Sequence, residues 1–315
     1  MYLIKTLGCI KQEAPPLERE KMTKPLFNGS CTALITPFTE NGIDLPAFEK
    51  LIENQVQSGI QALVVLGTTG EPATMTAQEK KLAIECCVST VSGRVPVIAG
   101  AGSNNTAAAA EAAALARTLK ADAVLAVTPY YNKCTPKGLH AHYEAIASAD
   151  LPVIIYNVPG RTGLNITPAV LESLSDISGL VAIKEASGSI DQLTDMLSRC
   201  GDRFTFYSGE DGLTLPMLAL GAQGVISVAS NILPADMQKL CELFFSGEVA
   251  QAAQLQIKLY PLIKALFCEV NPIPVKTAAS LMGICSSALR LPLTQMEEAN
   301  RARLVAAMQE YGINI

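Results

Sequence analysis

A single lysine near the middle of the chain stands where a buried strand is expected to end. Lys184 follows the apolar run 180–183 and precedes Glu185-Ala186-Ser187-Gly188, residues typical of a turn and a helix cap. Burial disfavours a charged ammonium, and a lysine that loses its proton becomes a nucleophile. The reaction that this arrangement indicates is Schiff-base formation with a carbonyl compound. Position alone is equally compatible with a lysine that caps a strand and extends its amine into solvent.

Hydroxyl and guanidinium groups follow other predicted strands in the same manner. The run 151–155 leads into Tyr156 and then Arg161, so a phenol and a guanidinium also stand at a strand end. Another strand leads into Gly67-Thr68-Thr69-Gly70-Glu71, whose hydroxyls and N–H groups suit a carboxylate, although a simple capped turn fits that motif equally well. The pair Tyr130-Tyr131 follows a further strand, where tyrosines alone more often indicate packing or an interface.

Eight apolar strand-like segments alternate with amphipathic helical segments. The predicted strands cover residues 31–35, 62–66, 95–99, 123–127, 153–156, 180–183, 204–207 and 224–228. The predicted helices cover residues 46–58, 77–92, 106–119, 137–149, 167–175, 190–200 and 213–220. Eight such repeats favour an α/β fold of the closed (β/α)8 barrel type over an open sheet, and the first strand lacks the glycine fingerprint of a dinucleotide-binding sheet. A barrel carries its site at the carboxyl ends of its strands, where the lysine, the tyrosines and the arginine fall.

The chain divides into three parts by its residue pattern. Residues 1–24 have mixed charge and no regular periodicity, and they are predicted to be a poorly ordered N-terminal extension without the features of a signal peptide. Residues 25–233 carry the predicted barrel, which forms the catalytic domain. Residues 234–315 carry the final barrel helix and a C-terminal helical region, because strand patterns stop there.

The composition argues against several classes of protein. With 49% hydrophobic and 17% charged residues among 315, the chain is predicted to fold around a large core and to form subunit interfaces. A net charge of −5 without a basic face argues against nucleic-acid binding, and no apolar run is long enough to span a membrane. Nine cysteines without a CxxC pair indicate reduced thiols of a cytoplasmic protein. The only two histidines, His140 and His142, do not share a helical face, so a histidine metal site or catalytic triad is not expected.

Taken together, these motifs resemble the dihydrodipicolinate synthase family, within the pyruvate-dependent aldolase superfamily that includes N-acetylneuraminate lyase. The resemblance runs from about residue 27 to the C-terminus. The segments that carry it are 67–71, 127–133, 156–163, 183–186, 208–211 and 271–276. Each segment is modest alone, but their order and spacing together are specific. The family condenses pyruvate with L-aspartate 4-semialdehyde in lysine and diaminopimelate biosynthesis, which is the activity that the resemblance implies.

The resemblance also implies a catalytic role for four residues. It implies that Lys184 forms the Schiff base with pyruvate and that Tyr156 moves protons during imine and carbon–carbon bond formation. Thr68 and Tyr131 would complete a proton relay, with Tyr131 contributed by a neighbouring subunit. The implied assembly is a homotetramer, and the covalent Schiff base would serve in place of any separate cofactor or metal.

Four further positions match substrate-binding residues of the family. Thr69, Ile226 and Gly209 would hold pyruvate, and Arg161 would meet the carboxylate of the semialdehyde with its planar fork. The arginine favours this substrate over the sugar aldehydes of sister aldolases such as N-acetylneuraminate lyase or a 2-keto-3-deoxy sugar acid aldolase. A barrel that serves only as a binding protein is the non-enzymatic alternative, and a sugar-phosphate isomerase rests on fold analogy alone.

One group of positions departs from the family pattern. Family members that lysine inhibits use a glutamate and histidine-type groups near the subunit interface. The corresponding positions here are Ala108, Ala77 and Lys80, whereas Asn104 and Tyr130 match the family's effector pocket. Without the glutamate to pair the effector's amine, weak or absent feedback by lysine is expected.

Overall fold

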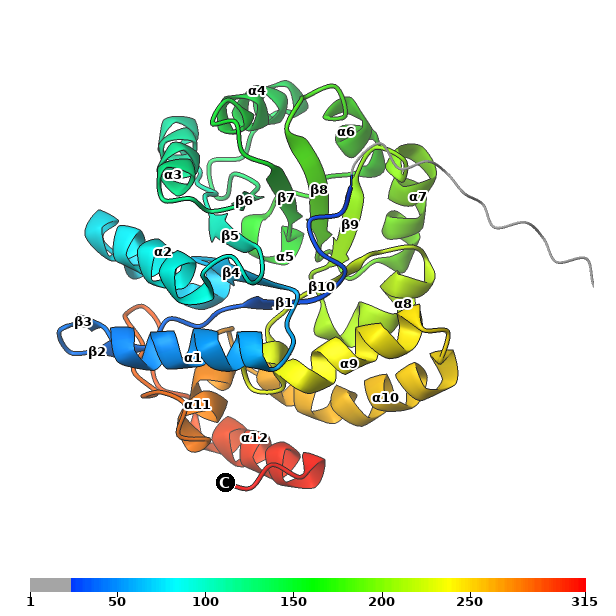
Figure 1. Ribbon diagram of the computed structural model, residues 1–315. Coiled ribbons are helices and arrows are strands. Elements are labelled where there is room, and N and C mark those ends of the chain that lie inside the picture. Colours follow the sequence, from blue (N-terminus) through cyan, green and yellow to red (C-terminus); the bar gives the residue numbers. More distant parts are fainter. Residues whose placement is uncertain (1–23) are drawn as a thin grey trace, which may run out of the picture.

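Eight parallel strands close into a barrel in the computed structural model, which describes residues 24–315 (Figure 1). The strands are β1 (Gly29–Ala33), β4 (Ala62–Val65), β5 (Val97–Gly100), β6 (Ala123–Val127), β7 (Val153–Asn157), β8 (Leu180–Glu185), β9 (Thr205–Ser208) and β10 (Gly224–Ser227). They pair in chain order, and β10 closes the ring against β1. The predicted (β/α)8 barrel is therefore confirmed. The extension expected at 1–24 lies outside the described residues except for its last residue.

Helices surround the barrel on its outside (Figure 1). They are α1 (Leu45–Gln57), α2 (Ala77–Val91), α3 (Thr106–Thr118), α4 (Pro136–Ala147), α6 (Pro168–Ser173), α7 (Ile190–Cys200), α8 (Thr214–Ala219) and α9 (Pro234–Phe245). Six of these eight begin where a Ser, Thr, Asp or Asn side chain accepts a hydrogen bond from a first-turn N–H group. Local capping thus sets where most helices start, and the strands set which face they bury.

The strand side chains divide into two cores, because successive residues of a strand face opposite sides of the sheet. Leu63, Val65 and Ile155 belong to the outer core between strands and helices. Ile154 and Ala182 belong to a separate cluster that fills the barrel interior. Parity along each strand therefore decides which residues reach the interior.

The strand that carries the lysine is longer than predicted. Lys184 lies inside β8 and not beyond it, since Glu185 is also a strand residue. Both residues pair with β7 on one side and β9 on the other, and this double pairing extends the strand past the apolar run. A small antiparallel hairpin of β2 (Phe38–Thr39) and β3 (Gly42–Ile43) was not predicted, because two-residue strands carry no periodic signal.

The C-terminal region is helical, as expected. It contains α10 (Val249–Leu266), α11 (Ile273–Leu281) and α12 (Glu298–Tyr311), and α12 packs against both of the others. The placement of a domain boundary at residue 233 stays a prediction. None of the helices formed by residues 24–315 combines the length and the apolar composition that crossing a bilayer requires.

The ion pair between Glu79, at the start of α2, and Arg290 makes the stability of the fold depend on pH. Hydrogen bonds from Arg290 lower the pKa of the Glu79 carboxyl to about 2, although partial burial opposes them. The folded-state pKa lies below the unfolded value of about 4.3, so this contribution is present above that pH and is lost as pH falls towards about 2. We expect Glu79→Gln to lower the thermal midpoint at pH 7, and the gap from wild type to shrink steadily below about pH 4.5. A gap of equal size at pH 7 and pH 3 would contradict this.

Candidate active site

The inner face of β7 and β8 brings Lys184 against Tyr156. The two residues are register partners, and Lys184 Nζ lies 4.4 Å from the centroid of the tyrosine ring. Lys184 is only 5% exposed, and no carboxylate among the described residues forms an ion pair with it. A buried amine held by an aromatic face and not engaged in an ion pair is suited to attack a carbonyl carbon.

The end of β9 leaves room for that amine. Gly209 N–H donates to the Glu185 carbonyl oxygen at 2.7 Å. A Cβ atom at Gly209 would lie 2.5 Å from Ala186 Cβ and 3.1 Å from Lys184 Cε, so any side chain there would clash with Ala186 and crowd the lysine. Ile226 of β10 is fully buried and belongs to the same interior cluster as Tyr156. Glycine at position 209 is thus required by the close approach of residues 184–186 at the end of β8.

Two carboxyl groups follow Gly209 and lie close enough to Lys184 to feel its charge. Burial raises the pKa of Asp211, whose Oδ2 accepts hydrogen bonds from the N–H groups of Val228 and Ala229 at 3.0 and 3.1 Å. Burial, and then repulsion from Asp211, raise the pKa of Glu210, and the charge of Lys184 opposes this. Asp211 therefore fixes the loop after β10 in place.

A short turn after β4 presents two threonines. Thr68 and Thr69 lie in η1 (Thr68–Gly70), where Thr69 is 3% exposed and its Oγ1 accepts a hydrogen bond from Asn271 Nδ2 at 3.0 Å. The turn is tied to the barrel because Thr36 Oγ1 donates to the Gly70 carbonyl oxygen at 2.8 Å. The motif is therefore an anchored turn rather than a free loop.

Arg161 lies in the short helix α5 (Pro159–Thr162), just after β7. Its NH2 group donates to the Asn271 carbonyl oxygen at 3.0 Å. The Asn271 side-chain oxygen is buried and has no hydrogen-bond partner among the described residues. One residue from the C-terminal region thus contacts both the threonine turn and the arginine.

A cavity of about 460 Å³ joins these elements. Among the predicted site residues, its wall includes Thr68, Tyr156 and Arg161. Lys184 and Gly209 are not wall residues, but Lys184 Nζ lies against the ring of the wall residue Tyr156, and Thr69 is hydrogen-bonded to the wall residue Asn271. Seven of the eight predicted residues therefore lie in the barrel interior or along this cavity. Ile226 is one of the seven because its side chain belongs to the interior cluster, although it is not a wall residue.

The eighth residue lies apart from the others. Tyr131 follows β6, is 91% exposed, and has a φ angle of +70°, which is unusual for a residue other than glycine. The next residue anchors the loop, because Asn132 Nδ2 donates to the Asn104 carbonyl oxygen at 2.9 Å. Within one chain, Tyr131 therefore projects away from Lys184.

Two polar groups that support the site were given no role from the sequence. Asn157 Nδ2 donates to Glu185 Oε2 at 2.8 Å, directly behind the Tyr156 and Lys184 pair. Glu185 Oε1 also accepts from Ser187 N–H at 2.7 Å, and these bonds oppose the burial that raises the pKa of its carboxyl. Strand alternation could have placed both residues on the outer face, once β7 was extended by one residue and β8 by two.

Comparisons with known proteins agree with this geometry. The model of the dihydrodipicolinate synthetase family matches residues 26–311. A 4-hydroxy-tetrahydrodipicolinate synthase of Clostridium perfringens is 49% identical over 289 residues, which cover 91% of this chain and 99% of the relative.

Solved structures give the same result. Dihydrodipicolinate synthase from Thermotoga maritima has a TM-score of 0.90 and 42% identity, covering 92% of this chain and 100% of that one. The chloride-inhibited dihydrodipicolinate synthase of Acinetobacter baumannii, solved in complex with pyruvate, has a TM-score of 0.89 and 40% identity, covering 91% of this chain and 99% of that one.

Proposed function

The chain belongs to the dihydrodipicolinate synthetase family, and from this premise we propose that it condenses pyruvate with L-aspartate 4-semialdehyde through a Schiff base on Lys184. Its activity is that of a 4-hydroxy-tetrahydrodipicolinate synthase, a lyase of the class I aldolase type in lysine biosynthesis. The observation that carries the proposed chemistry is the buried amine of Lys184, held over Tyr156 without a direct ion pair among the described residues.

The proposed reaction forms and breaks one bond to the lysine. Lys184 Nζ attacks C2 of pyruvate, and the carbonyl oxygen leaves as water to give an imine. Loss of a proton from C3 gives an enamine, whose C3 attacks the aldehyde carbon of the second substrate. The aldehyde oxygen takes up a proton and becomes a hydroxyl. The amino group of the bound product then displaces Lys184 from C2, which closes the ring and frees the enzyme.

Each of these steps moves a proton, so the proposal needs weak acids near the reacting atoms. Tyr156 is assigned the transfers at the imine nitrogen and at the new hydroxyl, because its ring lies against Lys184 Nζ. Thr68 lies on the same cavity wall as Tyr156 and would pass protons between that phenol and the neighbouring subunit's Tyr131. In this proposal, hydroxyl groups and the substrate imine supply the chemistry, and neither a metal nor a separate cofactor takes part.

The cavity supports a short acidic second substrate. Arg161 on its wall offers two parallel N–H groups to a carboxylate, whereas a sugar aldehyde would need several directed hydrogen bonds to hydroxyls. Thr69, Ile226 and Gly209 are assigned to pyruvate; Gly209 lies close to the lysine, and Thr69 and Ile226 are both buried.

A panel of aldehydes tests the proposed substrates. Purified protein is assayed with pyruvate and L-aspartate 4-semialdehyde, N-acetylmannosamine or the precursor aldehyde of a keto-deoxy sugar acid. The proposal predicts turnover with the semialdehyde alone. Turnover only with a sugar aldehyde would be consistent with a Schiff base but would contradict the assignment of Arg161. No turnover with any of the three aldehydes would contradict the proposed reaction.

We extend the proposal to assembly as a homotetramer in the cytoplasm. A tyrosine that is 91% exposed in a strained loop supports a partner surface, because a phenyl ring is rarely left in water without one. All eight cysteines in the described part of the chain are free, which is the usual state of thiols in the cytosol.

Mixed subunits test whether Tyr131 serves a partner's site. Lys184→Ala and Tyr131→Ala are each expected to be nearly inactive alone. In a mixed dimer, however, one site combines an intact lysine with an intact tyrosine from the partner, so random mixing should restore about a quarter of wild-type activity. Activity is measured after the two variants are unfolded together and refolded. A mixture no more active than its components would contradict the shared site.

The outer part of the cavity supports weak feedback by lysine. Lys80 and Ala108 are both wall residues, so a cationic effector would meet a like charge at one position and find no carboxylate at the other. We expect little inhibition at millimolar lysine, and Ala108→Glu should increase it. Strong inhibition of the wild-type enzyme in the same assay would contradict this expectation.

A further inference from the structure

A fully buried ion pair lies beside the threonine turn and takes no part in the proposed chemistry. Lys276 Nζ of α11 lies 2.6 Å from Glu71 Oε1, and the two side chains are 0% and 1% exposed. Glu71 directly follows the turn that carries Thr68 and Thr69. Burying two charges costs so much hydration energy that an apolar pair is often as stable, so stability alone is a weak explanation for this ion pair.

Further hydrogen bonds connect the Glu71–Lys276 pair to other residues of the C-terminal region. Lys276 Nζ also donates to the Ala288 carbonyl oxygen at 2.7 Å, and Arg290 N–H donates to Glu71 Oε2 at 3.2 Å. The ring of Phe38 contacts both cations, with its centroid 4.3 Å from Lys276 Nζ and 4.1 Å from Arg290 Cζ. Both carboxylate oxygens of Glu71 are therefore bound by the C-terminal region.

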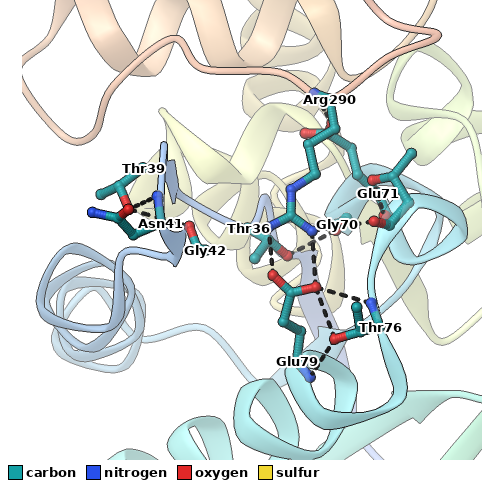
Figure 2. Close-up of polar contacts among 10 residues, drawn as sticks. Thr36, Thr39, Asn41, Gly42, Gly70, Glu71, Thr76, Glu79 and Arg290 are labelled. Carbon is teal, nitrogen blue, oxygen red and sulfur yellow. Dashed lines mark hydrogen bonds and ion pairs between the residues drawn. The ribbon is translucent and has the colours of Figure 1, made fainter.

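The same network of polar contacts extends to the start of α2. Figure 2 shows the guanidinium of Arg290 reaching Glu79, which it meets with two N–H groups, while Arg290 also donates to the Thr74 carbonyl oxygen at 3.1 Å. Glu79 Oε2 in turn accepts from Thr76 N–H at 2.9 Å. We call Glu71, Lys276, Arg290 and Glu79 the C-terminal clamp, because its two cations come from the C-terminal region and its two anions flank the segment 71–79.

The backbone of the segment 71–79 is strained at Glu71, so contacts from another part of the chain are needed to stabilise it. Glu71 has a φ angle of +57° and lies between two short 3-10 turns, a conformation that costs energy for any residue with a side chain. The same C-terminal region also contacts the turn at Thr69 through Asn271. The Thr69 hydroxyl and the backbone just after the turn are therefore held by a region about two hundred residues further along the chain.

We propose that the C-terminal clamp is a positioning device, in which the Glu71–Lys276 pair holds Thr68 and Thr69 in the geometry that the reaction needs. This inference rests on the proposed function, because it assigns the clamp to the threonines of that site. Loosening the clamp should raise the KM for pyruvate through Thr69 and lower kcat through Thr68. It should leave the amine of Lys184 able to react, because β8 is not part of the clamp.

The test removes both buried charges together. Glu71→Gln/Lys276→Met replaces the pair by neutral side chains of similar length, so neither charge is left buried alone. The thermal midpoint, kcat, the KM for pyruvate and borohydride trapping of pyruvate are then measured. We expect a thermal midpoint close to that of wild type, intact trapping at saturating pyruvate, and a loss of about tenfold or more in kcat/KM for pyruvate.

A second ion pair provides a matched control. Glu53 and Arg94 also form a hydrogen-bonded pair, but on the outer surface, and Glu53→Gln/Arg94→Met removes it by the same changes. We expect this variant to keep wild-type kinetics. Wild-type kinetics in a folded Glu71→Gln/Lys276→Met enzyme would overturn the proposal, since a merely structural pair would behave that way.

Further measurements distinguish failure of the clamp proposal from failure of the proposed function. If the buried double variant does not fold, the partly buried outer pair of the clamp is tested instead. Glu79→Gln/Arg290→Gln should also raise the KM for pyruvate, and unchanged kinetics would overturn the proposal. If wild-type protein itself shows neither turnover nor trapping, the proposed function fails, whereas an active wild type with an equally active clamp variant rejects the clamp alone.

Discussion

Lys184→Ala should abolish synthase turnover, with a loss on the order of 10⁴-fold or more in kcat, because no imine forms without the amine. The substitution removes a nearly buried lysine that has no ion pair among the described residues, so the fold should persist. Lys184→Arg keeps the positive charge but supplies a poor nucleophile, and it should be equally inactive. The measurements are steady-state kinetics and circular dichroism of both variants. Lys239→Ala, which changes an exposed lysine on α9, is the control and should keep wild-type turnover.

Two results would contradict this account of Lys184. Turnover of Lys184→Ala within about tenfold of wild type would mean that another group starts the reaction. Activity in Lys184→Arg but not in Lys184→Ala would mean that the charge matters and the nucleophile does not.

Tyr156→Phe should lower kcat by about 10²-fold to 10³-fold, because the substitution removes one hydroxyl from a proposed acid–base group. The aromatic ring that faces Lys184 Nζ is kept, so the position of the amine should be preserved. Pyruvate trapping should become slower but should still reach completion. Pre-steady-state trapping and steady-state kinetics separate these two effects.

A second buried tyrosine provides the control for Tyr156. Tyr143 OH donates to the Ala126 carbonyl oxygen at 3.1 Å in the outer shell of the barrel. Tyr143→Phe should cost about 1 kcal/mol of stability and leave kcat unchanged. Should Tyr156→Phe behave as this control does, the proposed proton transfers do not pass through Tyr156.

Most of the fold could be predicted because barrel periodicity is a local signal. Each of the eight strands starts and ends within two residues of its predicted position. This is because apolar runs and helix caps can both be recognised from a few neighbouring residues of the sequence. The end of β8 was missed for a physical reason. Lys184 and Glu185 are charged, and only their pairing with β7 and β9 keeps them in a strand.

The site could be predicted only where its residues lie at or just after the carboxyl ends of strands. Tyr156 lies near the carboxyl end of β7, and Arg161 and Thr68 lie in the short segments after β7 and β4, so barrel topology alone gathers them. Asn271 and the Glu71–Lys276 pair were given no role, because contacts across about two hundred residues leave no periodic trace in a single sequence. Tyr131 was assigned by resemblance alone, and one chain presents it to solvent.

The most direct test of the central claim is to locate the covalent adduct. Wild-type enzyme is incubated with pyruvate and borohydride, digested, and mapped by mass spectrometry. The account predicts one modified peptide, with the mass of pyruvate less water plus two hydrogens on Lys184. A modification on Lys276, on several surface lysines, or on no peptide at all would contradict the assignment of Lys184 as the nucleophile.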